Sequence, residues 1–165
     1  MSPARLALDH PERIIGLVLE ASPTTLKGDA NLDDFIGTVV SKLQDPIDPT
    51  FARSFVADTS SDGLPPALVD ELTAELLKVP ARVWKEMFLE LQTYDDMAEL
   101  EHIIMPTLLV WGTADSLVGR AMQDSLADRI RGAKLHIYHG VGHTPRWENP
   151  ARFVADVAAF CRTIR

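Results

Sequence analysis

The chain has 165 residues, a length that fits a single domain and allows about 68–70% of the unfolded surface to be buried. With 46% hydrophobic and 24% charged residues, its composition is that of a globular protein and excludes a disordered or fibrous one. The net charge of −8 argues against a nucleic-acid partner, because binding to phosphates requires a basic surface.

The N-terminal part predicts a short helix followed by a buried strand. Ser2 is a suitable N-cap and Pro3 suits the first helical position, whereas Pro11 ends the helix. The segment from Ile14 to Ser22 is a nearly continuous apolar run rich in Ile, Val and Leu. Such a run is typical of a strand that is covered on both faces, as in a parallel sheet.

Residues 23–101 are predicted to form a helical insertion. Leu68, Leu72 and Leu76 recur at four-residue steps, which is the spacing of one helix face. Helical spacing, punctuated by prolines, occurs in four segments: 32–43, 49–57, 65–77 and 80–91. A helical block of this length between strands is typical of a lid or cap rather than of a crossover connection.

The remaining residues return to an alternation of strands and helices. We expect a buried strand at 105–112, another strand at 133–140, an amphipathic helix at 119–130 and a closing helix at 149–164. In the last helix, Asn149 is the expected N-cap and Pro150 the first helical residue. The alternation indicates the α/β fold class, with about three parallel strands and flanking helices in a core formed by 1–22 and 102–165. The first strand is expected to present an open edge.

Two polar residues follow the last two predicted strands. Asp115 comes three residues after Gly112, and His143 lies a few residues after the strand at 133–140. Because one helix joins these strands, their carboxyl ends should be adjacent, where functional groups gather in open α/β sheets. A carboxylate there can orient an imidazole, which then accepts and returns a proton near neutral pH. Taken singly, each residue also fits a structural role, Asp115 in a turn and His143 in an exposed loop.

Three segments resemble the C-terminal portion of the α/β-hydrolase-fold family. MPTLLVWGTADSLV resembles the strand and turn with the family's catalytic acid, GVGHTPRWENPARFVADVAAF its histidine segment and final helix, and ARLALDHPERIIGLVLEAS the helix and strand that follow the nucleophile. The resemblance implies that Asp115 is the acid, that His143 is the base and that 23–101 is the cap domain. It also implies hydrolysis of an ester, lactone or related bond in a small-molecule substrate.

The nucleophile of that family is not found in this sequence. The family places it in a G-x-S-x-G elbow, and no such pattern occurs here. By the resemblance, the elbow would lie just upstream of Met1, so we expect a truncated α/β-hydrolase fold whose nucleophile, a serine or an aspartate, is absent from the chain. Ser2 lies near the expected place but lacks the flanking glycines. The elbow context is also lacking at Ser22, Ser60, Ser61 and Ser116.

Weaker candidates for lining a substrate pocket are Trp84, Phe88, Leu117, Val118 and Trp147. Each of them also fits a packing role: the first two within a cap helix, the next two in the turn after the acid, and the last beside the final helix. His136 and His139 are three residues apart, without a suitably placed third ligand. We therefore expect neither a metal nor a cofactor.

Cys161 and the absence of long apolar runs bear on the protein's location. Cys161 is the only cysteine, which excludes an internal disulfide and a cysteine-based metal site. It falls on the apolar side of the last predicted helix, where we expect a buried thiol. No stretch approaches the ~20 apolar residues of a membrane span, and the first residues lack a secretory signal pattern. These features favour a cytoplasmic protein with no membrane partner.

The sequence leaves two functional hypotheses open. The first is a cap-containing hydrolase whose Asp115–His143 pair works with a nucleophile from outside this chain. The second is a catalytically inactive hydrolase remnant that associates with itself or binds a small molecule. In that hypothesis, the open edge of the strand at 14–22 pairs with another copy and gives a homodimer or a higher oligomer.

Overall fold

The computed structural model describes residues 2–61 and 63–164. The chain divides into a core unit, formed by Met1–Thr24, Thr59–Gly63 and Asp96–Arg165, and a helical unit, formed by Thr25–Asp58 and Leu64–Asp95. The predicted insertion covers all of 23–101, whereas the structure groups 23–24, 59–63 and 96–101 with the core unit. The helical unit ends before residue 101 because Leu100 is part of the hydrophobic interior of the core unit.

The core unit is built on a three-stranded parallel sheet with the strand order β1-β2-β3. The strands are β1 (Leu17–Glu20), β2 (Thr107–Gly112) and β3 (Lys134–Tyr138). Leu19 pairs with Leu109 in β2, and Leu109 in turn pairs with Leu135 in β3. The predicted α/β class with three parallel strands is therefore confirmed.

The first strand is shorter than the apolar run from Ile14 to Ser22 that predicts it. Its pairing with β2 begins at Leu17, and Ile15 before it is 75% exposed. The strand ends where Ala21 adopts a left-handed conformation with φ of 45°, which turns the chain out of the sheet. The length of the strand is thus set by its partner and by this turn rather than by hydrophobicity alone.

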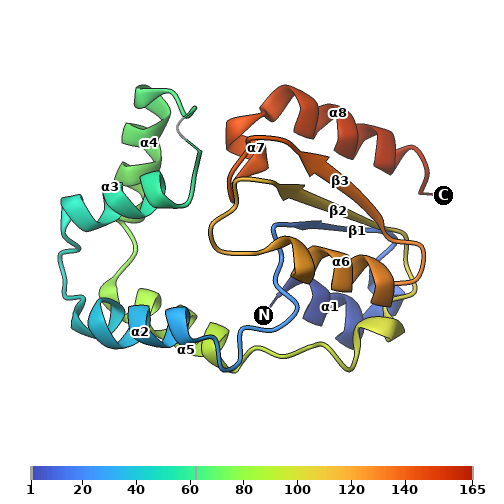
Figure 1. The fold of residues 1–165 in the computed structure, drawn as a ribbon, viewed down its shortest axis with the longest axis horizontal. Helices are drawn as coiled ribbons and strands as arrows, with labels where there is room; N and C mark the ends of the chain where they lie inside the picture. Colours follow the sequence, from blue (N-terminus) through green and yellow to red (C-terminus); the bar gives the residue numbers. More distant parts are fainter. Residues whose placement is uncertain (1, 62, 165) are drawn as a thin grey trace. The chain divides into compact units, whose positions relative to one another are not determined.

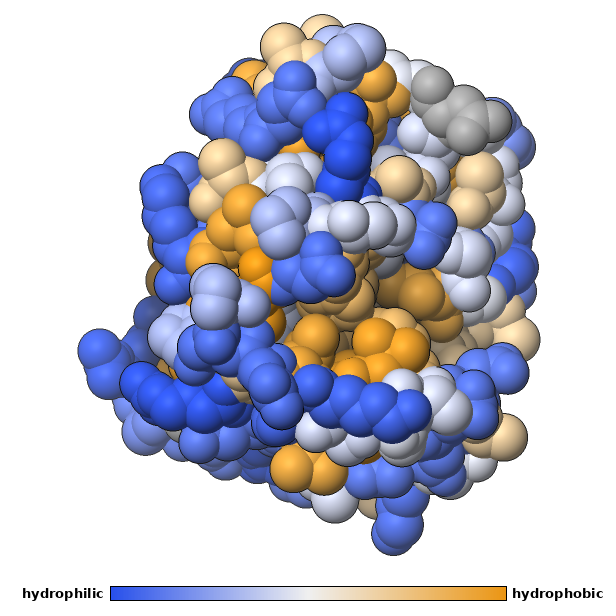
Figure 2. Space-filling view, turned by 90° about the vertical axis from the view of Figure 1, so that its left-hand side faces the viewer, coloured by the Kyte–Doolittle hydropathy of each residue, from blue (hydrophilic) through white to orange (hydrophobic). Residues whose placement is uncertain are grey.

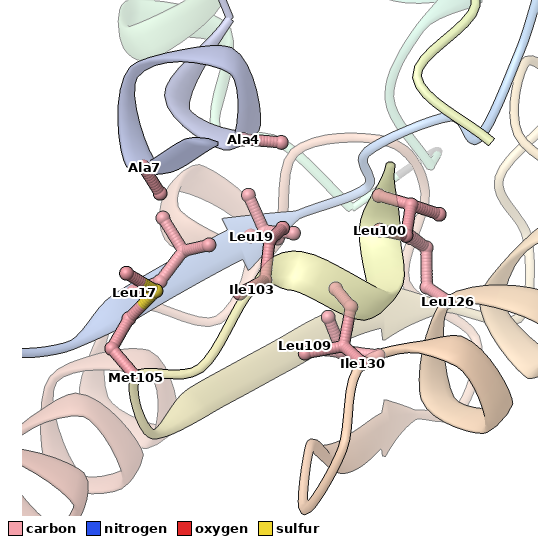
Figure 3. Packing of buried hydrophobic residues seen from close by; sticks show 10 residues of the cluster. All are labelled: Ala4, Ala7, Leu17, Leu19, Leu100, Ile103, Met105, Leu109, Leu126 and Ile130. Atoms are coloured by element: carbon pink, nitrogen blue, oxygen red, sulfur yellow. The ribbon is translucent and has the colours of Figure 1, made fainter. Parts of the chain in front are cut away.

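Helices cover both faces of the sheet. The helices α1 (Pro3–Asp9) and α6 (Arg120–Arg129) pack on one face, and α8 (Pro150–Cys161) packs on the other (Figure 1). The first interior, drawn in Figure 3, consists of Ala4, Ala7, Leu17, Leu19, Leu100, Ile103, Met105, Leu109, Leu126 and Ile130. The interior under α8 contains Leu108, Val110, Tyr138, Val141 and Phe160. Side chains along β2 alternate between the two interiors, as they must in a strand that is buried on both faces.

The helix ends follow the predicted capping residues. The hydroxyl of Ser2 accepts a hydrogen bond from the backbone N–H of Arg5, and the side-chain oxygen of Asn149 accepts one from Arg152. Shorter elements of the core unit are η1 (Pro11–Arg13), η3 (Leu100–His102) and α7 (Pro145–Glu148).

The expectation of a buried thiol at Cys161 is wrong. Cys161 is exposed, whereas its neighbour Phe160 is buried against the sheet. Successive helical residues differ by about 100° in direction, so the buried side of α8 passes through Phe160 and leaves the next residue outside.

The helical unit contains α2 (Ala30–Thr38), η2 (Val40–Lys42), α3 (Pro49–Asp58), α4 (Pro66–Leu76) and α5 (Ala81–Thr93). Its interior is rich in aromatic rings, with edge-on contacts of Trp84 to Phe51 and Phe55 at centroid distances of 5.3 and 5.1 Å. Thr25 and Asp95 pair in an isolated antiparallel bridge, so the chain enters and leaves this unit at neighbouring positions.

The visible face in Figure 2 carries many hydrophilic side chains, with hydrophobic ones exposed in patches between them. Over the described ranges, no helix is both long enough and apolar enough to cross a bilayer.

Exposed hydrophobic side chains of the helical unit include Leu77, Met87 and Leu89.

Candidate active site

The candidate site lies at the carboxyl ends of β2 and β3. The chain leaves β2 through residues 113–118 and leaves β3 through residues 139–144, and hydrogen bonds join these two loops. The backbone N–H of Ala114 donates to the carbonyl of Val141 over 2.9 Å, and the N–H of Gly140 donates to the hydroxyl of Thr113 over 2.9 Å. These two hydrogen bonds hold the loops together independently of Asp115 and His143.

Two glycines allow the backbone segments at this edge to approach closely. A Cβ atom on Gly112 would lie 2.1 Å from the carbonyl oxygen of Val141, a distance at which the loop would have to move. A Cβ atom on Gly142 would lie 2.7 Å from the backbone nitrogen of Ser61. The absence of a side chain at Gly112 thus permits the contact between β2 and the histidine loop, and its absence at Gly142 permits the contact of that loop with Ser61.

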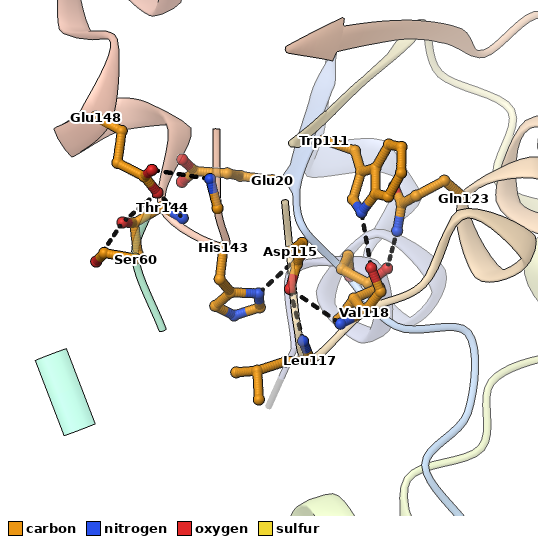
Figure 4. A network of polar contacts seen from close by, with 12 residues as sticks. Glu20, Ser60, Trp111, Asp115, Leu117, Val118, Gln123, His143, Thr144 and Glu148 are labelled. Atoms are coloured by element: carbon orange, nitrogen blue, oxygen red, sulfur yellow. Dashed lines mark hydrogen bonds and ion pairs between the residues drawn. The ribbon is translucent and has the colours of Figure 1, made fainter. Parts of the chain in front are cut away.

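Asp115 holds the imidazole of His143. One carboxylate oxygen accepts hydrogen bonds from the backbone N–H groups of Leu117 and Val118, at 2.8 and 3.0 Å. The other oxygen lies 3.0 Å from Nδ1 of His143 (Figure 4). The Asp115 side chain has no exposed surface, while that of His143 is 29% exposed.

This contact defines what the pair can do chemically. An ionised carboxylate only accepts hydrogen bonds, so Nδ1 of the neutral imidazole carries the ring proton and donates a hydrogen bond to Asp115. Nε2 is then the ring nitrogen that is able to accept a proton. The sequence-predicted pair is brought together with the geometry that a general base and its orienting acid require.

The backbone on both sides of His143 is also held. The N–H of His143 donates to the carbonyl of Thr59 over 3.0 Å. The hydroxyls of Ser60 and Thr144 lie 3.3 Å apart. Thr59 and Ser60, which come from between α3 and α4 in the sequence, are thereby attached to the histidine loop.

Glu148 at the end of α7 joins the same structure. One carboxylate oxygen accepts from the backbone N–H groups of Ser61 and Gly142, at 2.9 and 2.8 Å. The other accepts from the N–H and the hydroxyl of Thr144, both at 3.1 Å. Burial by itself would raise the pKa of Glu148, but the hydrogen bonds from Ser61, Gly142 and Thr144 outweigh it and hold the pKa below its ordinary value.

A second carboxylate fixes the other side of α7. Glu20, at the end of β1, accepts a hydrogen bond of 2.7 Å from the backbone N–H of Arg146 and also pairs with the guanidinium of that arginine. Neither Glu20 nor Glu148 is a candidate in the sequence analysis. The capping-box spacing would place an acidic residue three positions after Thr144, where Trp147 stands, so this pattern gives no signal for Glu148.

The other predicted pocket residues of the core unit have different surroundings. Leu117 is 50% exposed beside Asp115, whereas Val118 is buried and its carbonyl accepts a hydrogen bond of 2.7 Å from the indole of Trp111. Trp147 is partly exposed, and the guanidinium of Arg146 lies 5.1 Å from the centre of its ring. Of these three, Leu117 and Trp147 present accessible apolar surface.

Trp84 and Phe88 belong to the helical unit. Both are buried there, with their rings stacked at a centroid distance of 6.2 Å. Phe35 makes a further edge-on contact with Phe88 at 5.3 Å. Packing within the helical unit accounts for the burial of both rings, while the buried indole nitrogen of Trp84 has no hydrogen-bond partner among the described residues.

His136, one of the two histidines considered as metal ligands, lies beside a carboxylate. Its Nδ1 is 3.2 Å from Asp156, which also accepts a hydrogen bond of 2.6 Å from the hydroxyl of Tyr138. Burial raises the pKa of Asp156, but the hydrogen bonds from Tyr138 and His136 outweigh this effect and lower it overall. Within 2–61 and 63–164, no three potential metal-binding side chains come together as a metal site would require.

The fold and the site together define a class of protein. Parallel strands with helices on both faces carry, at the carboxyl edge, an imidazole that a buried carboxylate orients. A family model described as "Alpha/beta hydrolase family" matches residues 3–157. The chain belongs to the α/β hydrolase family.

Two curated relatives match nearly the whole chain. The first is a pimeloyl-[acyl-carrier protein] methyl ester esterase of Nitrosomonas europaea, which is 27% identical over 92% of this chain and 63% of its own length. The second is a 2-hydroxy-6-oxononadienedioate/2-hydroxy-6-oxononatrienedioate hydrolase of Cupriavidus pinatubonensis, which is 30% identical over 96% of this chain and 57% of its own length. The chain thus spans about three fifths of each relative.

Two solved structures have folds similar to that of this chain. A hydrolase from Pseudomonas aeruginosa superposes with a TM-score of 0.80 at 26% identity, and the match covers 96% of this chain and 60% of that one. An esterase from Thermogutta terrifontis gives a TM-score of 0.84 at 16% identity, with 97% of this chain and 60% of that chain covered. The second likeness establishes the fold alone.

Proposed function

We propose that this chain supplies the acid and the base of a hydrolase that cleaves an ester, lactone or related bond in a small molecule. Asp115 is the orienting acid and His143 is the base. The observation that carries the proposal is the contact of 3.0 Å between the buried Asp115 carboxylate and Nδ1 of His143. The activities of the two relatives, an esterase and a dienedioate hydrolase, support the reaction class.

In this proposal, Nε2 of His143 removes the proton from a nucleophile as that nucleophile attacks the carbonyl carbon. Asp115 stabilises the imidazolium that results, and the imidazolium then gives the proton to the leaving group. No G-x-S-x-G elbow occurs in this sequence, so the nucleophile comes from a polypeptide segment that these residues do not include. The helical unit acts as the cap, with Leu117 and Trp147 as the better candidates for contacts to the substrate and Trp84 and Phe88 as structural residues of the cap.

A fluorophosphonate, which reacts with activated serines, tests the proposal when adducts are read by intact mass. Two proteins are compared: the chain itself, and a fusion in which a strand and a G-x-S-x-G elbow precede it. We expect no adduct on the chain and one adduct on the fusion, accompanied by hydrolysis of an aryl ester. In the fusion, His143→Ala and Asp115→Asn should each suppress labelling and turnover.

Each result bears on a separate part of the proposal. An adduct on a serine of the chain itself, lost in His143→Ala, would show that the nucleophile lies within these residues. Full labelling and turnover of the fusion after His143→Ala would remove His143 from the role of base. Asp34→Asn, which changes an exposed carboxylate of the helical unit, serves as the matched control and should leave both readouts unchanged.

Self-association is a second proposal, and it rests on the position of β1. In the part of the chain that the structure describes, β1 pairs with β2 alone, so its other edge carries backbone groups without a strand partner. Pairing of this edge with a second copy would give a two-fold dimer. Light scattering tests this proposal: a dimer that Val18→Pro disrupts supports it, and a monomer at all concentrations contradicts it.

A further inference from the structure

The backbone on either side of His143 is held by a single carboxylate. Gly142 precedes His143 and Thr144 follows it, and the N–H groups of both donate to Glu148. Together with the contact between Asp115 and Nδ1, this leaves His143 fixed through its side chain and through the residues on both sides of it. In Figure 4, Glu148 and Asp115 lie on opposite sides of the loop that carries the imidazole.

We infer that Glu148 is a positioning residue for His143, and that its carboxylate holds the histidine loop where the imidazole reaches Asp115. The inference deepens the proposed function and rests on it, since it assigns the group that places the base. Glu148 itself makes no contact with the imidazole, and no role in proton transfer is assigned to it.

The pattern of donors explains why a carboxylate is needed at this position. Each oxygen of Glu148 accepts two hydrogen bonds, one oxygen from Ser61 and Gly142 and the other from the N–H and hydroxyl of Thr144. An amide side chain has only one oxygen, so in either orientation its NH₂ group would face at least one backbone N–H. Glutamine can therefore keep part of the arrangement, and alanine can keep none of it.

Glu148 does more than cap its own short helix. Ser61 is 87 positions away in the sequence, and its N–H donates to the same oxygen that holds Gly142. The adjoining contacts of this segment, from the N–H of His143 to Thr59 and between the hydroxyls of Ser60 and Thr144, lie on the same loop. Removing the carboxylate should therefore loosen the loop from residues 59–61 as well as from α7.

Nuclear magnetic resonance of the intact chain tests the inference, because it requires no nucleophile. With ¹⁵N-labelled histidine, the Nδ1–H proton of His143 gives a signal that reports both the tautomer and the hydrogen bond to Asp115. Three variants are compared with the unmodified chain: Glu148→Gln, Glu148→Ala and Asp115→Asn. The matched control is Asp156→Asn, which alters a carboxylate of the same unit whose polar partners, Tyr138, His136 and Arg152, lie outside the histidine loop.

We expect the Nδ1–H proton to exchange with solvent about tenfold faster in Glu148→Gln and faster again in Glu148→Ala, because a loosened loop breaks the hydrogen bond more often. The spectra are recorded at a temperature where circular dichroism shows each variant to be folded, so that a general loss of stability does not imitate the effect. Asp156→Asn should leave the exchange rate of this proton unchanged.

The Asp115→Asn variant separates failure of the inference from failure of the proposed function. If Asp115→Asn leaves the His143 signal intact, the acid–base pair itself is wrong. If Asp115→Asn removes the signal and both Glu148 variants keep the rate of the unmodified chain, the pair stands and Glu148 is not a positioning residue. Loss of folding in both Glu148 variants would make Glu148 a residue of general stability and would likewise overturn the inference.

Discussion

The carbonyl oxygen of Val141 lies 2.1 Å from the point where a Cβ atom on Gly112 would stand. Gly112 is the last residue of β2, and Val141 belongs to the loop that carries His143. The close approach of these two residues sets the separation between the loop with the acid and the loop with the base. A single methyl group at this position is therefore a direct probe of the site.

Gly112→Ala should destabilise the core unit by about 1–3 kcal/mol, because the new methyl group would force the backbone of the histidine loop to move. Urea unfolding measures the change in the free energy of unfolding. Gly37→Ala is the matched control, because no heavy atom lies within 4 Å of its Cβ position in helix α2, apart from its chain neighbours and the adjacent backbone of the helix itself. That control should be neutral or slightly stabilising, since alanine is a better helix former than glycine. Equal effects of the two substitutions would show that the contact with Val141 is not tight.

Asp115→Asn should retain much of the fold but lose the function of the pair. Asparagine has one oxygen, which can accept from the N–H groups of Leu117 and Val118, but its NH₂ group would face Nδ1 of His143 and favour the wrong tautomer. In the elbow-bearing fusion, we expect kcat for an aryl ester to fall by about 10³–10⁴-fold, with a much smaller change in KM. A fall of less than tenfold would contradict the assignment of the acid.

Acidification should weaken the core unit through Glu148 and Asp156. Both carboxyls have pKa values below their ordinary values of 4.5 and 3.8, because hydrogen bonds that stabilise the charged forms outweigh burial. A lowered pKa in the folded state contributes stability above the ordinary pKa, and this contribution is lost as the pH falls through the lowered value. The free energy of unfolding should therefore decline below about pH 5. The decline should be shallower in Glu148→Gln and in Asp156→Asn, and an identical slope in all three proteins would refute this origin.

Tyr138→Phe should destabilise the core unit by about 1.5–3 kcal/mol, because the hydroxyl of Tyr138 is buried and donates to the charged Asp156. A double-mutant cycle with Asp156→Asn, measured by urea unfolding, isolates this interaction. We expect the two single changes to be non-additive, with a coupling of at least about 0.5 kcal/mol. Strict additivity would mean that the hydrogen bond contributes nothing to stability.

Much of the sheet can be predicted from the sequence. The apolar run that ends at Gly112 predicts a buried strand, and the residues before His139 predict a further strand; both strands are present. The proximity of Asp115 and His143 also follows from the sequence, because consecutive parallel strands joined by one helix place their exit loops side by side. The pattern of hydrophobic residues, together with the adjacency of parallel strands joined by one helix, is enough to predict these features.

The features that sequence analysis misses depend on distant parts of the chain. Glu148 accepts a hydrogen bond from Ser61, and no pattern of residues around either position predicts this contact. The end of β1 is set by the backbone turn at Ala21, in a run whose hydrophobicity continues beyond it. The exposure of Cys161 depends on which side of α8 meets the sheet. A shift of one residue along the helix turns a side chain by about 100°, and the sequence pattern does not fix the buried side that closely.

The core unit is formed by three separate segments of the chain, and this arrangement affects the order in which its strands assemble. Leu109 meets Leu135 after closing a loop that contains only α6, whereas its contact with Leu19 must close a loop that contains the whole helical unit. Loop closure becomes less favourable in entropy as the loop lengthens, and contacts distant in sequence form slowly. Assembly is therefore expected to start from β2, α6 and β3, with β1 added later. Until β1 arrives, β2 has an open edge, and this is the period when the nascent chain is most exposed to aggregation.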